Sequence, residues 1–542
     1  MPKIRNLAEL ESIRCQAQHS LSMQQKKVLV CCGTGCIAGG SLLIYDRIKE
    51  TCRARGIDVC VELKHEPHGE NIGLKASGCH GFCEMGPLLK IEPLGVLYIK
   101  VKLSDCDEII ERSIIGDEVI ERLLYTQNGK AYQHQEEIPF YHKQTRIVLS
   151  NCGQTNAEDV LEYIAKGGYS ALSKVLFEMN PESVCQTILE SNLRGRGGGG
   201  FPAGRKWDQV RRQPEPVHYV VCNGDEGDPG AFMDRSIMEG DPHKMLEGMM
   251  IAGYAAGARE GFIYVRAEYP LAIRRLQTAI AKAEEWGLLG ENILGSKFSF
   301  TLHINRGAGA FVCGEGSALT ASIEGSRGMP RVKPPRTVEQ GLFGKPTVLN
   351  NVETFANVPL IIQNGADWYR SIGPEKSPGT KAFALTGNVN NTGLIEVPMG
   401  TTLREVIMDI GGGIKNGKNF KAVQIGGPSG GCLITSDLSI SLDFDSLKKV
   451  GAMIGSGGLV VMDEDTCMVE VARFFMHFTQ NESCGKCVPC REGTRRMLEI
   501  LERIVAGEGT LEDLDMLEDL ARMISDTALC GLGKTAASPV AS

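Results

Sequence analysis

Cysteine is the residue type whose spacing in this chain points most directly to chemistry. The sequence holds 19 cysteines, of which Cys484, Cys487 and Cys490 form one tight group and Cys530 follows well downstream. A C-x2-C-x2-C run with one distant cysteine is typical of [4Fe–4S] ligands. A zinc site takes the same number of sulfurs, but three ligands so closely spaced favour the cubane cluster. These cysteines therefore predict an electron-transfer centre near the C-terminus.

A second group of cysteines lies near the N-terminus. Cys31 and Cys36 enclose a glycine-containing turn after an apolar strand, and Cys79 and Cys83 enclose another. Four thiolates on two tight turns suit a [2Fe–2S] cluster, and the turn glycines let backbone N–H groups approach its sulfides. Cys32 is an alternative ligand to Cys31, but the spacing favours Cys31. A zinc site or free thiols is the competing interpretation, although zinc typically prefers a two-residue spacer.

A glycine-rich segment at 193–207 is the first candidate for binding a phosphate. It contains G-x-G-x-x-G at Gly195, Gly197 and Gly200, but a helical pattern precedes it, whereas a dinucleotide fingerprint requires a strand. Consecutive glycines before a helix still expose backbone N–H groups that can cradle an anion, and Lys206 adds positive charge. The simpler interpretation is a flexible loop.

Polar and acidic residues follow the predicted strand at 218–222. They read Asn-Gly-Asp-Glu-Gly-Asp-Pro-Gly over 223–230, and the carboxyl ends of strands are where α/β sheets bind ligands. Further downstream come a glycine-rich segment at 307–316, a basic segment at 331–336, and the pair Asn350 and Asn351. Each could be a turn when taken singly.

The elements that must position these residues belong to several domains. A chain of 542 residues with 42% hydrophobic and 23% charged residues is globular and too long for one core. We expect an α/β first piece with a helix at 41–56 and a strand at 58–63, and a helix at 402–410 in a later α+β module. The predicted segments are 1–125 ([2Fe–2S] domain), 126–144 (linker), 145–375 (large α/β domain), 376–455 (small module) and 456–542 (helical [4Fe–4S] domain).

Charge and hydropathy exclude several classes of partner. The formal net charge is −8 with no basic cluster, which argues against nucleic acid and anionic membranes. No apolar run approaches the roughly 18 residues needed to span a bilayer, and the N-terminus is not a secretory signal. We therefore expect a cytoplasmic protein that does not insert into membranes.

Together these motifs resemble one family. The two N-terminal cysteine pairs are similar to the thioredoxin-like [2Fe–2S] ferredoxin domain of a small respiratory complex I subunit. Residues from about 145 to 535 resemble the NADH-binding flavoprotein subunit of complex I and of related soluble hydrogenases and formate dehydrogenases. The resemblance implies an α/β multidomain fold: a thioredoxin-like domain, a Rossmann-like FMN domain, a ubiquitin-like β-grasp (SLBB) module without assigned chemistry, and a helical [4Fe–4S] bundle.

The resemblance also implies site residues. Nicotinamide stacks on the flavin in this family and hydride passes between the rings, so no side chain is expected to act as acid or base. The residues expected at FMN are Gly195, Gly197, Lys206, Asn223, Asp225, Gly314, Asn350 and Asn351. Those expected at NAD(P)H are Phe201 (on the adenine), Glu226, Asp228, Phe311, Glu315, Gly316, Lys333 and Arg336.

Two departures from the family pattern bear on nucleotide specificity. Gly316 replaces a glutamate that binds the adenosine ribose hydroxyls in NADH-using members, and Arg336 replaces a phenylalanine beside the adenine. A carboxylate repels a ribose 2′-phosphate and an arginine pairs with it, so both changes favour NADPH. The alternative is drift within an NADH site, with Arg336 turned to solvent.

The fused domain order is similar to the diaphorase subunit of soluble multimeric hydrogenases and transhydrogenases, a group with electron-bifurcating members. The implied partners are a catalytic subunit, a small [2Fe–2S] subunit and ferredoxin. Two alternatives remain open: an NADH-linked subunit of a formate dehydrogenase or NADH dehydrogenase, and a flavin-less scaffold that carries clusters. Such relatives often have a further C-terminal ferredoxin-like domain, which this member lacks unless the sequence is truncated.

Overall fold

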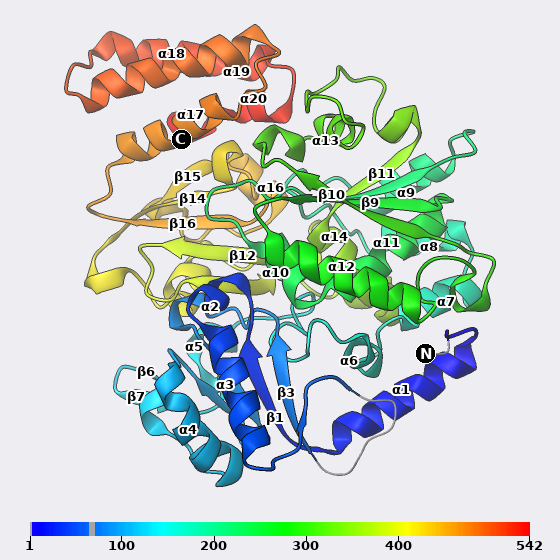
Figure 1. The fold of residues 1–542 in the computed structure, drawn as a ribbon. Coiled ribbons are helices and arrows are strands. Elements are labelled where there is room, and N and C mark those ends of the chain that lie inside the picture. Colours follow the sequence, from blue (N-terminus) through cyan, green and yellow to red (C-terminus); the bar gives the residue numbers. More distant parts are fainter. Residues whose placement is uncertain (1–2, 64–70) are drawn as a thin grey trace.

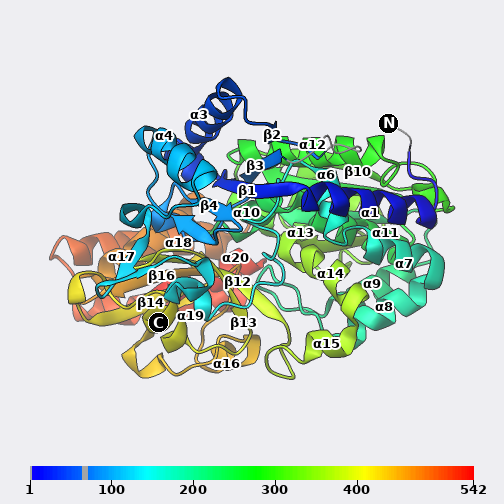
Figure 2. The ribbon, with the colours of Figure 1, turned by 90° about the horizontal axis from the view of Figure 1, so that it is seen from below.

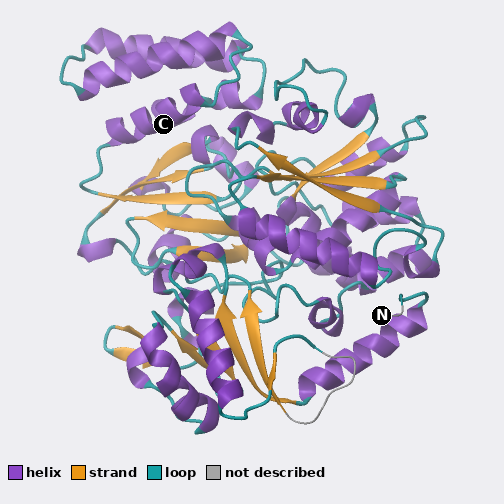
Figure 3. Cartoon of the chain, in the orientation of Figure 1, coloured by secondary structure: helices purple, strands orange, loops and turns teal. Residues whose placement is uncertain are grey.

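The computed structural model describes residues 3–63 and 71–542; the remaining residues fall in the predicted first domain. Figure 1 shows four regions in chain order: the N-terminal region in blue, a large region in green, a sheet in yellow and a helical region in orange and red. Figure 3 shows that strands form the centre of the first three regions and that the last is helical. The predicted multidomain α/β fold is confirmed.

The N-terminal region is built on a five-stranded sheet in the order β2-β3-β1-β4-β5. β1 (Gln24–Cys31) and β3 (Asn71–Ser77) are parallel, β4 (Leu89–Glu92) and β5 (Val96–Tyr98) are antiparallel neighbours, and α3 (Ser41–Ala54) packs on the sheet. The strand predicted at 58–63 is confined to β2 (Val59–Cys60). Because β1 ends at Cys31, the first cysteine turn starts at the carboxyl edge of this sheet.

The first helix does not pack with the cysteine turns. α1 (Leu7–Ser22) lies against α6 (Val160–Ala165), where Arg14 Nε donates to the Ile164 carbonyl at 3.3 Å. Figure 2 shows α1 extending from β1 along the green region. The N-terminal segment thus attaches the cysteine-bearing sheet to the next part of the chain.

Residues 126–144, predicted as a linker, contain regular structure. They include the end of β6 (Tyr125–Gln127), β7 (Lys130–Tyr132) and α5 (Pro139–His142). Phe140 is fully buried and stacks on Phe82, with ring centroids 4.3 Å apart. Because Phe82 lies in the second cysteine turn, this segment supports that turn from behind.

The large central region is a four-stranded parallel sheet in the order β10-β9-β8-β11, flanked by helices. β8 and β11 pair so that Asn223 lies opposite Asn351. The carboxyl ends of parallel strands share one edge, so the acidic segment after β8 meets the asparagine pair of β11. The strands are β8 (Tyr219–Gly224), β9 (Glu260–Arg266), β10 (Thr301–Gly307) and β11 (Thr347–Asn351). The helices are α7 (Ser170–Glu178), α8 (Pro181–Glu190), α9 (Ala203–Arg211), α10 (Met233–Gly240), α11 (Pro242–Ala256), α12 (Pro270–Glu285), α13 (Gly316–Ile323), α14 (Val352–Asn364) and α15 (Ala366–Arg370).

The small module is a mixed five-stranded sheet in the order β13-β12-β16-β14-β15. The predicted boundary at 455 is wrong, because β16 lies beyond it and pairs with both β12 and β14. The helix predicted at 402–410 is a π-helical stretch over Glu405–Ile410. The strands are β12 (Thr380–Gly387), β13 (Gly393–Pro398), β14 (Phe420–Ile425), β15 (Gly431–Ile434) and β16 (Gly458–Asp463), with α16 (Phe444–Lys449) before β16.

The C-terminal region is a helical bundle with its own apolar core, which includes Met497, Ile500 and Ile524. Of the helices in the described residues, none combines the length and apolar character needed to cross a bilayer. The helices are α17 (Met468–Asn481), α18 (Val488–Val505), α19 (Leu511–Thr527), α20 (Gly531–Thr535) and α21 (Ser538–Ala541).

Candidate functional site

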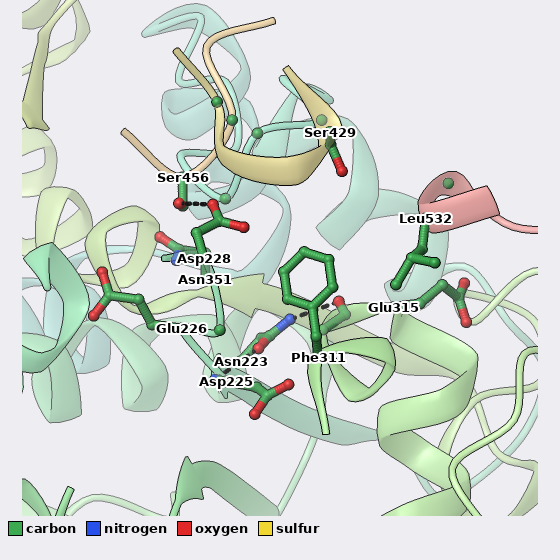
Figure 4. A pocket seen from close by; sticks show the side chains of 18 of the residues that line it. Asn223, Asp225, Glu226, Asp228, Phe311, Glu315, Asn351, Ser429, Ser456 and Leu532 are labelled. Atoms are coloured by element: carbon green, nitrogen blue, oxygen red, sulfur yellow. Dashed lines mark hydrogen bonds between the residues drawn. The ribbon is translucent and has the colours of Figure 1, made fainter. Parts of the chain in front are cut away.

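A cavity of about 270 Å³ opens at the carboxyl edge of β8 and β11. Figure 4 shows Phe311 pointing into it, between Asp228 on one side and Leu532 on the other. The predicted residues that line it are Gly197, Asn223, Asp225, Glu226, Asp228, Phe311, Gly314, Glu315 and Asn351. Segments far apart in the sequence therefore meet at one cavity.

The glycine-rich loop forms one wall of this cavity. The Gly195 N–H donates to the Phe201 carbonyl at 3.0 Å, which closes the loop just before α9. Gly198 has a φ of +105°, a conformation that residues with a Cβ rarely adopt. A Cβ on Gly197 would lie 3.0 Å from the Asn351 Cβ. The loop backbone is thus pressed against β11, and it faces the cavity at 197–199.

Asp225 presents an unsatisfied carboxylate to the cavity. Both of its oxygens are buried without a hydrogen-bond partner, and burial raises its pKa to about 7. Beside it, Asn223 Nδ2 donates to the Gly314 carbonyl at 3.0 Å. A buried carboxylate with no donor is costly unless a ligand supplies one. The cavity therefore fits a polar group rich in N–H or O–H donors, such as the ring and ribityl chain of a flavin.

Glu226 connects the cavity to α10. Its carboxylate accepts hydrogen bonds from the backbone N–H groups of Asp234 and Arg235, each at 3.0 Å, and so caps the first turn of that helix. Asp234 also lines the cavity, and its carboxylate accepts a hydrogen bond from Asn351 Nδ2. Burial raises the pKa of both carboxyl groups. The start of α10 is thus part of the site.

The β-grasp module, for which no chemistry was expected, supplies a wall of the cavity. Ser456, just before β16, donates a hydrogen bond to Asp228, whose pKa burial raises to about 6. In the sequence the glycine-rich segments of this module indicate turns, and nothing local indicates that they face another domain. The lining residues absent from the prediction are Gly198, Gly199, Gly227, Asp234, Val312, Gly426, Ser429, Met453, Gly455, Ser456, Gly531, Leu532 and Thr535.

Seven predicted residues do not line the cavity, and two of these, Lys206 and Asn350, bond to or belong to β11, at whose carboxyl end the cavity opens. Lys206 Nζ donates to the Leu349 carbonyl at 2.6 Å, and burial lowers the pKa of Lys206 to about 8. Asn350 is buried and accepts a hydrogen bond from Trp207 Nε1 at 3.0 Å. Outside the lining are Gly195, Phe201, Lys206, Gly316, Lys333, Arg336 and Asn350.

The residues bearing on nucleotide specificity lie around the start of α13. Glu315 caps this helix, accepting from the Ser317 and Ala318 N–H groups, and pairs with Lys333 Nζ at 2.6 Å. Burial opposes ionisation of Glu315, but Lys333 and Ser317 together hold its pKa below the ordinary value. Arg336 is exposed. Lys333 and Arg336 thus lie near Gly316, the position at which NADH-using members of the resembled family carry a glutamate.

The four C-terminal cysteines line a second, smaller cavity that adjoins the first. Cys484, Cys487, Cys490 and Cys530 all face it, and its remaining walls include Val312 and Leu532. These two apolar residues also line the larger cavity. Four sulfurs around one space fit a [4Fe–4S] cluster, and only the shared wall separates it from the proposed flavin position.

The N-terminal cysteines meet as two adjacent turns. The sulfur atoms of Cys79 and Cys83 lie 3.8 Å apart, and the Cys31 thiol lies within hydrogen-bonding reach of Cys36 and Cys79. Cys32 points into the opposite core, with α3, whereas Cys31 and Cys36 share a core with the second turn. In the part of the chain that the structure describes, no three His, Cys, Asp or Glu side chains surround a single ion position. The arrangement favours Cys31 over Cys32 as a ligand.

Comparison with known proteins agrees with this geometry. Residues 188–360 match the Nuo51 FMN-binding domain, 383–433 the SLBB domain, and 470–542 the NADH-ubiquinone oxidoreductase-F iron-sulfur binding region. The chain is 57% identical to the NADP-reducing hydrogenase subunit HndC of Solidesulfovibrio fructosivorans over 400 residues, covering 74% of this chain and 81% of that protein. It is 48% identical to the second NADH-quinone oxidoreductase F protein of Rhizobium meliloti (strain 1021), covering 72% of this chain and 93% of that protein. A solved NAD+-reducing [NiFe]-hydrogenase in the H2-reduced state matches with a TM-score of 0.66 and 29% identity, over 98% of this chain and 85% of that one.

The fold and the site define a flavin- and iron–sulfur-carrying oxidoreductase subunit, with an FMN-binding domain and a [4Fe–4S] region. The chain belongs to the family of FMN-binding flavoproteins that includes HndC and the F subunits of NADH-quinone oxidoreductases. The resemblance inferred from the motifs is thereby confirmed.

Proposed function

We propose that this chain oxidises NAD(P)H at the cavity beside β8 and passes the electrons to clusters at both ends of the chain. The observation that carries the proposal is the wall shared by the two cavities. Val312 and Leu532 line both the proposed flavin space and the space among the four C-terminal cysteines. Bound in this cavity, FMN would supply the chemistry that links two-electron hydride transfer from the nucleotide to one-electron release. A single layer of side chains then separates the electron donor from its first acceptor.

The chain's own residues hold the flavin and the nucleotide in place. The 197–199 backbone would supply N–H groups, while Asp225 would accept from the flavin through its unpartnered oxygens. Phe311 lies where a nicotinamide ring would be sandwiched, and Ser456 closes the cavity from the β-grasp module. These contacts orient two rings and exclude water, which is the protein's part in hydride transfer.

We assign NADPH as the preferred nucleotide. Lys333 and Arg336 lie on the loop facing α13, and Gly316 leaves room and no negative charge there. HndC, the relative with 57% identity, is named as a subunit of an NADP-reducing hydrogenase. The exposed guanidinium of Arg336 and the ammonium group of Lys333, which is paired with Glu315, would offer positive charge to a ribose 2′-phosphate, and position 316 adds no carboxylate to repel it.

The second cluster and the partners complete the proposal. The turns at Cys31–Cys36 and Cys79–Cys83 are assigned to a [2Fe–2S] cluster. The relatives are named as subunits of a hydrogenase and a quinone oxidoreductase, which supports a hetero-oligomeric complex with a hydrogenase- or transhydrogenase-type catalytic subunit. A cytoplasmic location is part of the same proposal. Bifurcation of electrons between nucleotide and ferredoxin is a further proposal, tested only in the reconstituted complex.

The test is an anaerobic titration of the purified complex with NADPH and, separately, with NADH, followed by visible bleaching. We expect bleaching at a much lower concentration of NADPH. Bleaching first with NADH would leave the redox function standing and overturn the specificity. Absence of bleaching with both nucleotides, together with no flavin fluorescence after acid release, would overturn the function and favour a flavin-less scaffold.

A further inference from the structure

Helix α10 joins the flavin cavity to the N-terminal cysteine turns. Its first turn is capped by Glu226, and Asp234 lines the cavity. Its last turn carries Glu239, which reaches into the other domain. Figure 1 shows α10 directly above α2 (Thr34–Ala38), the short helix inside the first cysteine turn. One helix of eight residues therefore touches both proposed redox sites.

The Glu239 carboxylate is bonded to the first cysteine turn. It accepts a hydrogen bond from the Thr34 N–H at 3.0 Å and another from the Thr34 hydroxyl. Thr34 lies between Cys31 and Cys36, and Glu239 is only 1% exposed. A carboxylate this deeply buried is screened little by salt, so its charge acts strongly on whatever those cysteines hold.

Two arginines surround this contact. Arg275, also 1% exposed, donates to the Glu239 carbonyl and to the Cys32 carbonyl, the latter at 3.1 Å. Arg235 Nε lies 3.8 Å from the Glu239 carboxylate, and its guanidinium stacks between Phe232 and Tyr269. Its charge also reaches the Cys83 thiol of the second turn.

The backbones approach equally closely beside these side chains. A Cβ on Gly78, next to Cys79, would lie 2.3 Å from the Gly240 Cα at the end of α10. The second cysteine turn therefore packs directly against the end of α10, with no space for a side chain between the two backbones. Because the effect of a charge depends on its distance, this close packing fixes how strongly charges on α10 act on the reduction potential of a cluster held by the turns.

We propose that Glu239 is a positioning residue that lowers the reduction potential of the [2Fe–2S] centre, and that Arg235 acts in the opposite direction. The proposal rests on the proposed function, because it takes the four N-terminal cysteines as ligands. Reduction of the centre takes up one electron, supplied by NAD(P)H oxidation, and changes no bond in the chain. A nearby negative charge disfavours that electron, and Glu239 also holds a Thr34 N–H that could otherwise donate to sulfur.

The test is an EPR-monitored redox titration of the purified complex at pH 8.5. We expect Glu239→Gln to raise the midpoint of the [2Fe–2S] signal, by about tenfold in the reduction equilibrium, or roughly 59 mV for one electron. Glu239→Asp keeps the charge and should stay near wild type, which separates charge from side-chain shape. Arg235→Gln should lower the midpoint. Glu50→Gln, an exposed change in the N-terminal domain that carries the four cysteines, is the matched control.

Each outcome decides the matter. A wild-type complex without a [2Fe–2S] signal would refute the underlying cluster assignment, independently of Glu239. A wild-type signal with unchanged midpoints in Glu239→Gln and Arg235→Gln would overturn the present proposal alone. If Glu239→Gln fails to assemble the cluster, the midpoint measured in Arg235→Gln tests the proposal instead. That variant should fold, because the backbone N–H of residue 235 still donates to Glu226 and keeps the helix cap.

Discussion

Restoring the missing carboxylate at position 316 should reverse the nucleotide preference. Gly316 is the first residue of α13, and a Cβ there would lie 3.5 Å from Leu349 Cδ1 and 3.7 Å from Thr337 Cγ2, both ordinary contacts. Gly316→Glu should therefore fold. Replacing glycine contributes roughly 0.5–1 kcal/mol of stability, and a negative charge at a helix N-terminus adds about 0.3–1 kcal/mol, so the melting temperature should not fall.

The effect on binding follows from charge repulsion. At a separation of about 8 Å and an effective dielectric of about 20, two unit charges repel by about 2 kcal/mol. Physiological salt, with a Debye length of about 8 Å, reduces this to about 0.7 kcal/mol. A phosphate with about two charges then loses about 1.4 kcal/mol, which is a tenfold weaker affinity.

The assay is the dissociation constant of NADPH and of NADH, measured by anaerobic titration of Gly316→Glu and of its uncharged match, Gly316→Gln. NADPH binding should weaken about tenfold only in the glutamate variant, while NADH binding stays nearly unchanged or improves through the ribose hydroxyls. Equal weakening of both nucleotides, or the same result with glutamine, would refute the reasoning and place Arg336 away from the 2′-phosphate.

Three further predictions concern the remaining parts of the site. The pKa of Asp225 is raised to about 7, and a donor from the flavin would lower it. Binding then releases a proton below that pH, so FMN affinity for the deflavinated chain should rise with pH up to about 7 and level off above it. Asp225→Asn should remove that dependence, measured by flavin fluorescence quenching, and a persisting slope would contradict the assignment. Ser456→Ala removes the hydrogen bond to Asp228, worth about 1 kcal/mol, so the KM for nucleotide should rise roughly fivefold with kcat nearly constant; an unchanged KM would mean that the β-grasp wall does not contact the nucleotide. Cys31→Ser should abolish the [2Fe–2S] EPR signal whereas Cys32→Ser should retain it, and the reverse result would exchange the two ligands.

The sequence by itself determined the chemistry that the chain carries. Ligand spacing is a local property, because Cys484, Cys487 and Cys490 are close in sequence and line one cavity. The same holds for the glycine loop and for the acidic segment after β8, because the residues at the carboxyl end of a strand are its immediate neighbours in sequence. These short motifs were sufficient to predict the family, the fold class and the cofactors FMN and [4Fe–4S], all of which the comparisons confirm.

Tertiary structure decided which surfaces enclose the site. Ser456 and Leu532 lie far along the chain from the glycine loop, and nothing in their neighbouring residues indicates that they line its cavity. Cys31 and Cys32 are adjacent in sequence but point to opposite faces of the sheet at the end of β1, so packing alone separates them. The hydrogen bond from Thr34 to Glu239 likewise depends on how two domains pack together. Hydrophobic periodicity predicts helices and strands from residues that are close in sequence. The contacts between those helices and strands depend on side-chain packing between residues far apart in sequence, which a local pattern does not contain.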